Sequence, residues 1–186
     1  QDGKQYPVSL EYAGQTVKIV TESVTVPNAP QKGTITVHKT DSETGKPTIL
    51  SPATFEIHAK NDIITGDGTV RYQAGELVDT LTTAGGSATS KPLYLGSYIV
   101  TEKTAPEGYV LNTEPQEVTL RYGGQTVELV TESVTFANAP QKGQIVVQKN
   151  DADSGKPITA SPAVFEIRAK TDIMTADGTV RYKAGE

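Results

Sequence analysis

Short stretches of alternating apolar and polar residues run through most of this 186-residue chain. Successive side chains of a strand point to opposite faces, so this alternation predicts half-buried strands. The clearest cases are Thr34–Thr40, Ala53–Lys60 and Tyr94–Glu102. No stretch keeps a helical period over a window of about eleven residues. The pattern therefore predicts an all-β protein.

Two hairpins are predicted from turn residues between apolar runs. An Asp-Gly turn separates Ile63–Ile64 from Val70–Tyr72, which indicates an inserted hairpin. A Gly-Gly turn separates Glu117–Tyr122 from Thr126–Val130 in the same way. Regular short strands with Gly and Pro turns favour an antiparallel β-sandwich. The other predicted strands are Leu77–Thr82 and Ser133–Asn138, with Ala84–Ser87 as a loop.

Three polar residues share the apolar face of a predicted strand with two core residues each. They are Lys39, in phase with Ile35 and Val37; Glu102, in phase with Tyr98 and Val100; and Asn138, in phase with Val134 and Phe136. A buried lysine, glutamate and amide are costly unless they satisfy one another. These are the residue types from which a lysine and an asparagine side chain form an amide cross-link. Their pattern predicts such a site inside the protein.

Two stretches of the sequence recur at an offset of 110 residues. Val8–Pro30 returns as Val118–Pro140, and Gln31–Glu76 returns as Gln141–Glu186. A period this long indicates tandem domains, because solenoid units are shorter. We expect a chain that begins and ends inside repeat units. One complete module, 33–140, would lie between the C-terminal part of a preceding repeat, 1–30, and the N-terminal part of a following repeat, 143–186.

The two copies of the first strand test which face is buried. Ile35, Val37 and Lys39 reappear unchanged, so the lysine behaves like its core neighbours. Every change falls on the outward phase, where Thr34, Thr36, His38 and Thr40 become Gln144, Val146, Gln148 and Asn150. The linker between copies is short and holds a proline, which favours a semi-rigid rod of modules.

Composition and residue spacing argue against nucleic-acid binding, membrane insertion and metal binding. The formal charge is −5, with scattered Lys and Arg, which argues against nucleic acid because phosphate binding needs clustered basic residues. No apolar run approaches membrane-spanning length, so no membrane insertion is expected of this sequence. His38 and His58 lack companions at ligand spacing, and the acids lack calcium-loop spacing, so we expect no metal and no cofactor. Cysteine is absent, so a secreted protein of this kind needs another covalent link.

Several longer motifs together resemble a known family. They are Ile35–Lys39, Thr44–Pro47, Phe55–Ile57, Gly96–Glu102 followed by Ala105–Tyr109, and Phe136–Pro140. They are similar to the Cna B-type (SpaA-type, prealbumin-like) domains of Gram-positive surface adhesins and pilins. The resemblance spans the whole of 33–140. The long stretch between Ile57 and Thr83 departs from the family pattern and suits an enlarged loop or an extra hairpin.

The resemblance implies an Ig-like, prealbumin-like antiparallel β-sandwich in tandem repeats, with first and last strands side by side and Lys39 bonded to Asn138. Burial favours a neutral lysine and a protonated glutamate. We expect Lys39 as nucleophile, Asn138 as electrophile and Glu102 as acid/base in a single turnover, with no other catalysis. Three plainer readings stay open: a snorkelling surface lysine, an asparagine that only serves a turn, and a buried Lys–Glu ion pair without the bond.

The terminal copies hold incomplete sites. Asn28 and Lys149 are the repeat equivalents of Asn138 and Lys39, and each lacks its partners in this sequence. The head of one chain and the tail of another carry complementary strands, so head-to-tail pairing between chains is a further expectation. Because such a pair lacks the glutamate, we expect no bond between Lys149 and Asn28.

The leading interpretation is a stalk or spacer repeat of an extracellular, cell-wall-anchored adhesin or pilus-like protein. Its partners are neighbouring repeats of the same protein, and a host surface ligand would bind through other domains. The alternative is a ligand-binding module that docks a host glycan or matrix protein on the Asn61–Gln73 insertion. No exposed aromatic cluster supports that alternative in the sequence.

Overall fold

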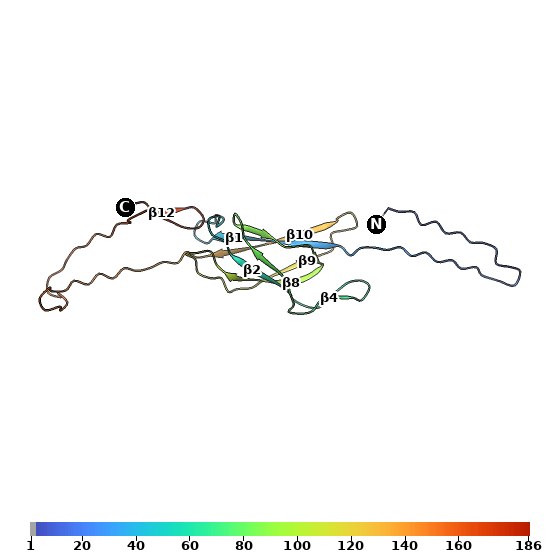
Figure 1. Cartoon of the computed structure of the whole chain (residues 1–186), viewed down its shortest axis with the longest axis horizontal. Coiled ribbons are helices and arrows are strands. Elements are labelled where there is room, and N and C mark those ends of the chain that lie inside the picture. Colours follow the sequence, from blue (N-terminus) through green and yellow to red (C-terminus); the bar gives the residue numbers. More distant parts are fainter. Residues whose placement is uncertain (1–2) are drawn as a thin grey trace.

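The computed structural model describes residues 3–186. A central β body lies between two extended segments, one leading in from the N-terminus and one leading out toward the C-terminus (Figure 1). The described residues contain strands and turns and no helix, which confirms the predicted all-β class. Residues 32–138 form two four-stranded sheets.

The first sheet is centred on β1 (Lys32–Asp41). β10 (Leu129–Asn138) lies parallel to β1 along all ten residues of the strand. On its other side β1 pairs antiparallel with two short strands, β6 (Ser87–Thr89) and β7 (Leu93–Tyr94). The first and last strands of the module therefore lie side by side, as the resemblance implied.

The second sheet is antiparallel throughout. Its strand order is β5-β2-β8-β9. Each strand pairs with its neighbours through an alternating register, with small bulges along β2. The strands are β2 (Thr54–Ala59), β5 (Leu77–Thr82), β8 (Gly96–Thr104) and β9 (Gln116–Leu120).

Two small hairpins stand outside these sheets. β3 (Ile63–Ile64) and β4 (Val70–Tyr72) form the hairpin predicted over the Asp-Gly turn. Its repeat equivalent, β11 (Ile173–Met174) with β12 (Val180–Tyr182), forms the same hairpin 110 residues later. The β11–β12 hairpin returns to the end of β1 (Figure 1).

The core lies between the two sheets and comes from the inward phase of each strand. Ile35 and Val37 from β1 meet Phe55 and Ile57 from β2, all fully buried. Phe55 and Phe136 pack ring against ring with centroids 5.0 Å apart. Tyr98 is fully buried, and its hydroxyl donates to the Tyr94 carbonyl. The outward phase of β1 is less uniform than expected, since Thr34 is also buried.

Two strand predictions were wrong. The sequence predicted that Thr126–Val130 pairs back onto Glu117–Tyr122, but residues 129–138 form one continuous strand that pairs with β1 instead. Because β10 pairs with β1 of the first sheet and not with β9 of the second, Phe136 and Asn138 on β10 are buried. Part of the predicted loop Ala84–Ser87 begins strand β6, which pairs with β1.

Among residues 3–186 we find no helix with the length and apolar character that crossing a bilayer requires.

Candidate cross-linking site

The parallel pairing of β1 with β10 brings the predicted lysine and asparagine together. In the register, Lys39 lies opposite Phe136 and Asp41 lies opposite Asn138. All four side chains are buried, because alternate residues share the inward face. Asn138 is two residue pairs along the ladder from Lys39, on the same inward face, so the long lysine side chain has only this distance to span. Glu102 comes from β8 in the opposite sheet and enters the same space.

The three polar side chains converge in the interior. Lys39 Nζ lies 3.7 Å from Glu102 Oε1 and donates to the Phe136 carbonyl at 2.8 Å. Asn138 Nδ2 donates to Glu102 Oε2 at 2.8 Å. The glutamate therefore bridges the amine and the amide through its two oxygens. The structure brings Lys39, Glu102 and Asn138 into contact, which the strand phase alone could not establish.

Burial of the three is nearly complete. The exposed fractions are 0% for Lys39, 5% for Glu102 and 2% for Asn138. Two buried oxygens, Glu102 Oε1 and Asn138 Oδ1, lack a hydrogen-bond partner among the described residues. An unmet buried acceptor costs about 1–3 kcal/mol. The constellation is therefore poorly explained as a stabilising ion pair alone.

Burial also changes the protonation of the lysine. It lowers the pKa of the Lys39 ammonium from 10.5 to about 8, although the carboxylates of Glu102 and Asp41 favour the charged form. A lower pKa increases the fraction of free amine near neutral pH, and the free amine is the nucleophilic form. Lys39 therefore has the character expected of a nucleophile that attacks an amide carbon.

The loop after β8 closes the site from outside. The backbone N–H of Asn112 donates to Glu102 Oε2 at 2.8 Å, so that oxygen accepts two hydrogen bonds. The loop is attached to the end of β10, because the Val110 N–H donates to the Ala139 carbonyl. The same loop holds the Ala105–Tyr109 motif, whose Tyr109 hydroxyl donates to Asp41 at 2.7 Å.

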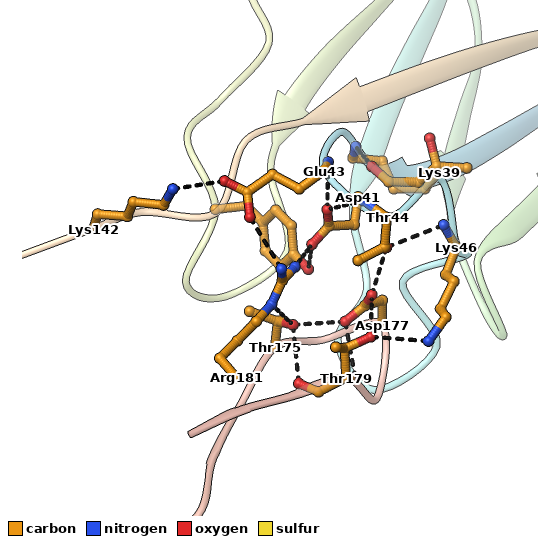
Figure 2. Close-up of polar contacts among 12 residues, drawn as sticks. Lys39, Asp41, Glu43, Thr44, Lys46, Lys142, Thr175, Asp177, Thr179 and Arg181 are labelled. Atoms are coloured by element: carbon orange, nitrogen blue, oxygen red, sulfur yellow. Dashed lines mark hydrogen bonds and ion pairs between the residues drawn. The ribbon is translucent and has the colours of Figure 1, made fainter. Parts of the chain in front are cut away.

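Asp41, the last residue of β1, is a further buried polar residue beside the site. The turn is present, since Asp41 Oδ1 accepts from the N–H groups of Glu43 and Thr44 at 2.7 and 3.0 Å. The side chain is also fully buried, and its other oxygen accepts from Tyr109 and Arg181 (Figure 2). Asp41 is in phase with Lys39, and that spacing was the available signal.

The environment of Asp41 keeps it ionised. Burial acts to raise the pKa of its carboxyl, but hydrogen bonds from Tyr109 and two backbone N–H groups, with Arg181 beside it, hold the pKa below 3.8. Burial and the Asp41 carboxylate together raise the pKa of Tyr109 to about 12. This end of β1 therefore carries a fixed negative charge next to Lys39.

The repeat equivalents of the site lie in different surroundings. Asn28 and Lys149 are exposed, in extended segments where the structure has no strand. Their pairing between neighbouring chains stays a prediction. The site therefore has its three members together in the copy at 33–140.

Several solved bacterial pilin structures are similar to part of this chain. No curated protein matches it. Similar solved structures include the T6 backbone pilin of serotype M6 Streptococcus pyogenes (31% identity, 47% of this chain, 16% of the pilin, TM-score 0.37). The group B streptococcus pilus 2b backbone protein is 27% identical over 68% of this chain and 46% of its own, with a TM-score of 0.41. The major pilin SpaD from Corynebacterium diphtheriae is 22% identical over 59% of this chain and 30% of its own, with a TM-score of 0.42. The chain spans less than half the length of each.

A family profile gives the more direct assignment. Residues 33–135, more than half of the chain, match the family described as "SpaA: Prealbumin-like fold domain". The matched residues cover most of the two packed sheets and contain Lys39 and Glu102, while Asn138 lies three residues beyond the match. The chain belongs to the SpaA family of prealbumin-like fold domains.

Proposed function

We propose that this chain is part of the stalk of an extracellular, cell-wall-anchored adhesin or pilus-like protein, built from tandem modules. Each module is stabilised by an amide bond that it forms between its own lysine and asparagine. The observation that carries the proposal is the buried contact of Glu102 with both Lys39 and Asn138. Membership of the SpaA family and the 110-residue repeat support the structural role.

The proposed reaction joins Lys39 Nζ to the side-chain carbonyl carbon of Asn138 and releases ammonia. Glu102 accepts a proton from the lysine ammonium, which frees the amine to attack. The carboxyl group then returns a proton to Asn138 Nδ2, with which it shares a 2.8 Å hydrogen bond. Nζ loses a second proton to the Glu102 carboxylate as the carbon–nitrogen bond to Nδ2 breaks, and ammonia carries that proton away as ammonium. No oxidant or cofactor is consumed, and the module reacts once.

The bond would replace the disulfides that the sequence lacks. It closes a loop of about 100 residues, which by analogy with disulfides stabilises the module by about 4–5 kcal/mol. Because it joins neighbouring ends of the first and last strands, tension along the chain passes through it and bypasses the sandwich. This property suits a stalk that carries load.

The test is the intact mass of the full chain. We expect a deficit of one ammonia in the natural chain and in Lys149→Ala, and no deficit in Lys39→Ala. Lys149 is the matched control because it is the repeat equivalent of Lys39 without a glutamate. An undiminished mass in folded natural chain would overturn the cross-link but not the family.

Host-ligand binding through the Asn61–Gln73 hairpin stays an alternative prediction. It is tested by measuring binding of the chain to host glycans and matrix proteins.

A further inference from the structure

The β11–β12 hairpin binds the turn that follows β1, far away in the sequence. Arg181 donates to Asp41 at 2.7 Å and to Glu43 at 3.0 Å (Figure 2). Thr44 donates its hydroxyl proton to Asp177 at 2.7 Å. The contact thus pairs an arginine with two acids of the turn, and an acid of the hairpin with a hydroxyl of the turn.

Further contacts surround this pair of interactions. Lys46 donates to Thr179 at 3.2 Å, and the Leu50 N–H donates to the Ala176 carbonyl at 2.9 Å. Lys142, in the linker, pairs with Glu43 at 2.7 Å. Asp177 and Ala176 become buried in the contact. A buried aspartate is stable here because it accepts from three threonines, which lowers the pKa of its carboxyl despite burial.

Both sides of the contact form their own structure independently of it. In the hairpin, Thr175 donates to Asp177 at 2.6 Å and Arg181 Nε donates to Thr175 at 3.1 Å. The first copy repeats these bonds between the equivalent residues at 2.6 and 2.9 Å. The second copy of the turn repeats the aspartate-to-backbone bonds at Asp151. The surfaces are therefore preorganised, and little ordering cost opposes their association.

The hairpin lies at the end of the module where the linker enters. Tyr72 of β4 packs against Tyr94 with ring centroids 5.8 Å apart, and Tyr94 pairs with Lys32 at the start of β1. The turn lies at the opposite end, where the Ser42 N–H donates to the Asn138 carbonyl. In a rod of modules, the hairpin of one module therefore faces the turn of the module before it.

We infer that this contact is the junction between consecutive modules: the hairpin after the second strand of each module binds the turn after the first strand of the preceding one. The inference rests on the proposed tandem array. Each copy in the sequence carries both surfaces. The hairpin residues Thr65, Asp67, Thr69 and Arg71 recur unchanged, and the turn residues Asp41, Glu43, Thr44 and Lys46 recur as Asp151, Asp153, Ser154 and Lys156.

The geometry of a complete module agrees with this junction. Within the module, Lys32 and Arg71 both lie over the Tyr94 ring, at 4.6 and 5.0 Å. Their repeat equivalents, Lys142 and Arg181, both bind Glu43. Linker lysine and hairpin arginine therefore lie close together in both settings.

The first copy of the hairpin shows the surface without a partner. Asp67 is exposed, with 58% of its side chain accessible, whereas the equivalent Asp177 is buried. No described residue of another copy contacts Asp67 or Arg71 through a hydrogen bond or ion pair. The β3–β4 hairpin thus has the same preformed shape with its binding surface free.

The first experiment measures hydrogen exchange of the Leu50 amide in the full chain. Leu50 is an exposed residue whose N–H is bonded across the junction, so its protection reports the contact. We expect Arg181→Glu to speed this exchange by about tenfold or more, and the matched control Arg71→Glu to leave it unchanged. Equal exchange in the two variants would overturn the inference. The intact mass, read on the same samples, reports the cross-link separately.

The second experiment places the junction between two complete modules. Residues 33–142 are duplicated in frame, which lengthens the chain by one repeat. Because the protein has no cysteine, Leu50→Cys in the first module with Gly66→Cys in the second forms the only possible internal disulfide. Gly66 is the repeat equivalent of Ala176. We expect a loss of two hydrogens in mass for this pair.

The control carries Leu50→Cys and Gly66→Cys in the same module, where the two positions lie at opposite ends. We expect it to keep two free thiols in the monomer. Equal disulfide yields in the two chains, or none in the chain with the cysteines in different modules, would overturn the inference.

Discussion

At the residue scale, the proposed function depends on three side chains whose burial is unfavourable for each one alone. Lys39 is buried beside a carboxylate, Glu102 holds an oxygen without a hydrogen bond, and Asn138 does the same. Forming the bond removes the lysine charge and one amide nitrogen from the interior. The proposed reaction would therefore relieve the unfavourable burial of these residues in the core.

The role of Glu102 gives a direct prediction. In Glu102→Gln the side chain keeps its size but can no longer accept the lysine proton, so we expect a folded module without the bond. The mass should show no ammonia deficit, and thermal unfolding should occur at a clearly lower temperature. Glu132→Gln, an exposed change on β10, serves as the control. A full ammonia deficit in Glu102→Gln would remove Glu102 as the acid/base.

The lowered pKa of Lys39 predicts a pH dependence in protein that has not reacted. Asn138→Ala keeps Lys39 and removes its target. In the folded state the Lys39 pKa is about 8, below its unfolded value of 10.5, so above pH 8 the unfolded chain binds a proton that the folded chain does not. The free energy of unfolding should therefore rise from about pH 8 toward the unfolded pKa.

Chemical denaturation between pH 7 and pH 9.5 measures this rise, below the range where tyrosines ionise. Lys39→Met combined with Asn138→Ala is the control and should give a flat profile. A fall in stability over this range would contradict the assigned burial of the amine.

At the element scale, β1 organises the site because it pairs with three strands at once. Its partner β10 supplies Asn138. On the other side of β1, the turn that leads into β6 is bound to Lys39, whose N–H donates to the Gly86 carbonyl at 2.8 Å. The backbone of Lys39 is therefore bonded on the side of β6, and its side chain is directed toward β8 and β10. The strand pairing sets where the amine lies.

Gly86 tests this arrangement. Its φ of +84° belongs to the left-handed region, and an added Cβ would lie 2.6 Å from Pro47 Cβ. Gly85 also has a positive φ, +60°, but has nothing within 4 Å. Both alanine substitutions should cost about 1–2 kcal/mol for the backbone, and Gly86→Ala about 1–3 kcal/mol more for the clash.

Denaturant unfolding in the Asn138→Ala background measures the difference between these two substitutions. Equal losses of stability would show that the turn against Pro47 does not constrain β1.

At the scale of the whole molecule, the chain places the two-sheet module between extended segments (Figure 1). Lys39 and Asn138 sit near the same end of the parallel β1–β10 pair, so little of the module lies outside the proposed bond. In the proposed array, the β11–β12 hairpin would add a non-covalent contact between modules. The proposed bond and this contact would together make a rod that resists extension within modules and bending between them.

Pulling single molecules from their ends tests the load path. Glu102→Gln should show an extra unfolding event that releases the loop of about 100 residues, equivalent to roughly 330–360 Å at 3.3–3.6 Å per residue. The natural chain should lack that event. A release of this length in natural protein with a confirmed ammonia deficit would contradict the proposed load path.

The sequence by itself determined most of the strands and the buried phase of Lys39, Glu102 and Asn138, because alternation records which side chains avoid water. It also determined the β3–β4 hairpin, since an Asp-Gly turn acts locally. It could not determine that 129–138 is one strand, because a strand receives its hydrogen bonds from a partner distant in sequence. The same limit explains Val24–Asn28, which repeats the β10 pattern yet forms no strand without a β1 beside it.

Tertiary structure alone decided the contacts between side chains. Burial of Asp41 and its pairing with Arg181 join residues 140 positions apart, and no local pattern encodes such a distance. The contact of Glu102 with Lys39 depends on how the two sheets stack, since they come from opposite layers. Alternation in a strand predicts which side chains are buried. A reaction needs a particular second side chain in contact, and only the packing of elements distant in the sequence brings that side chain into place.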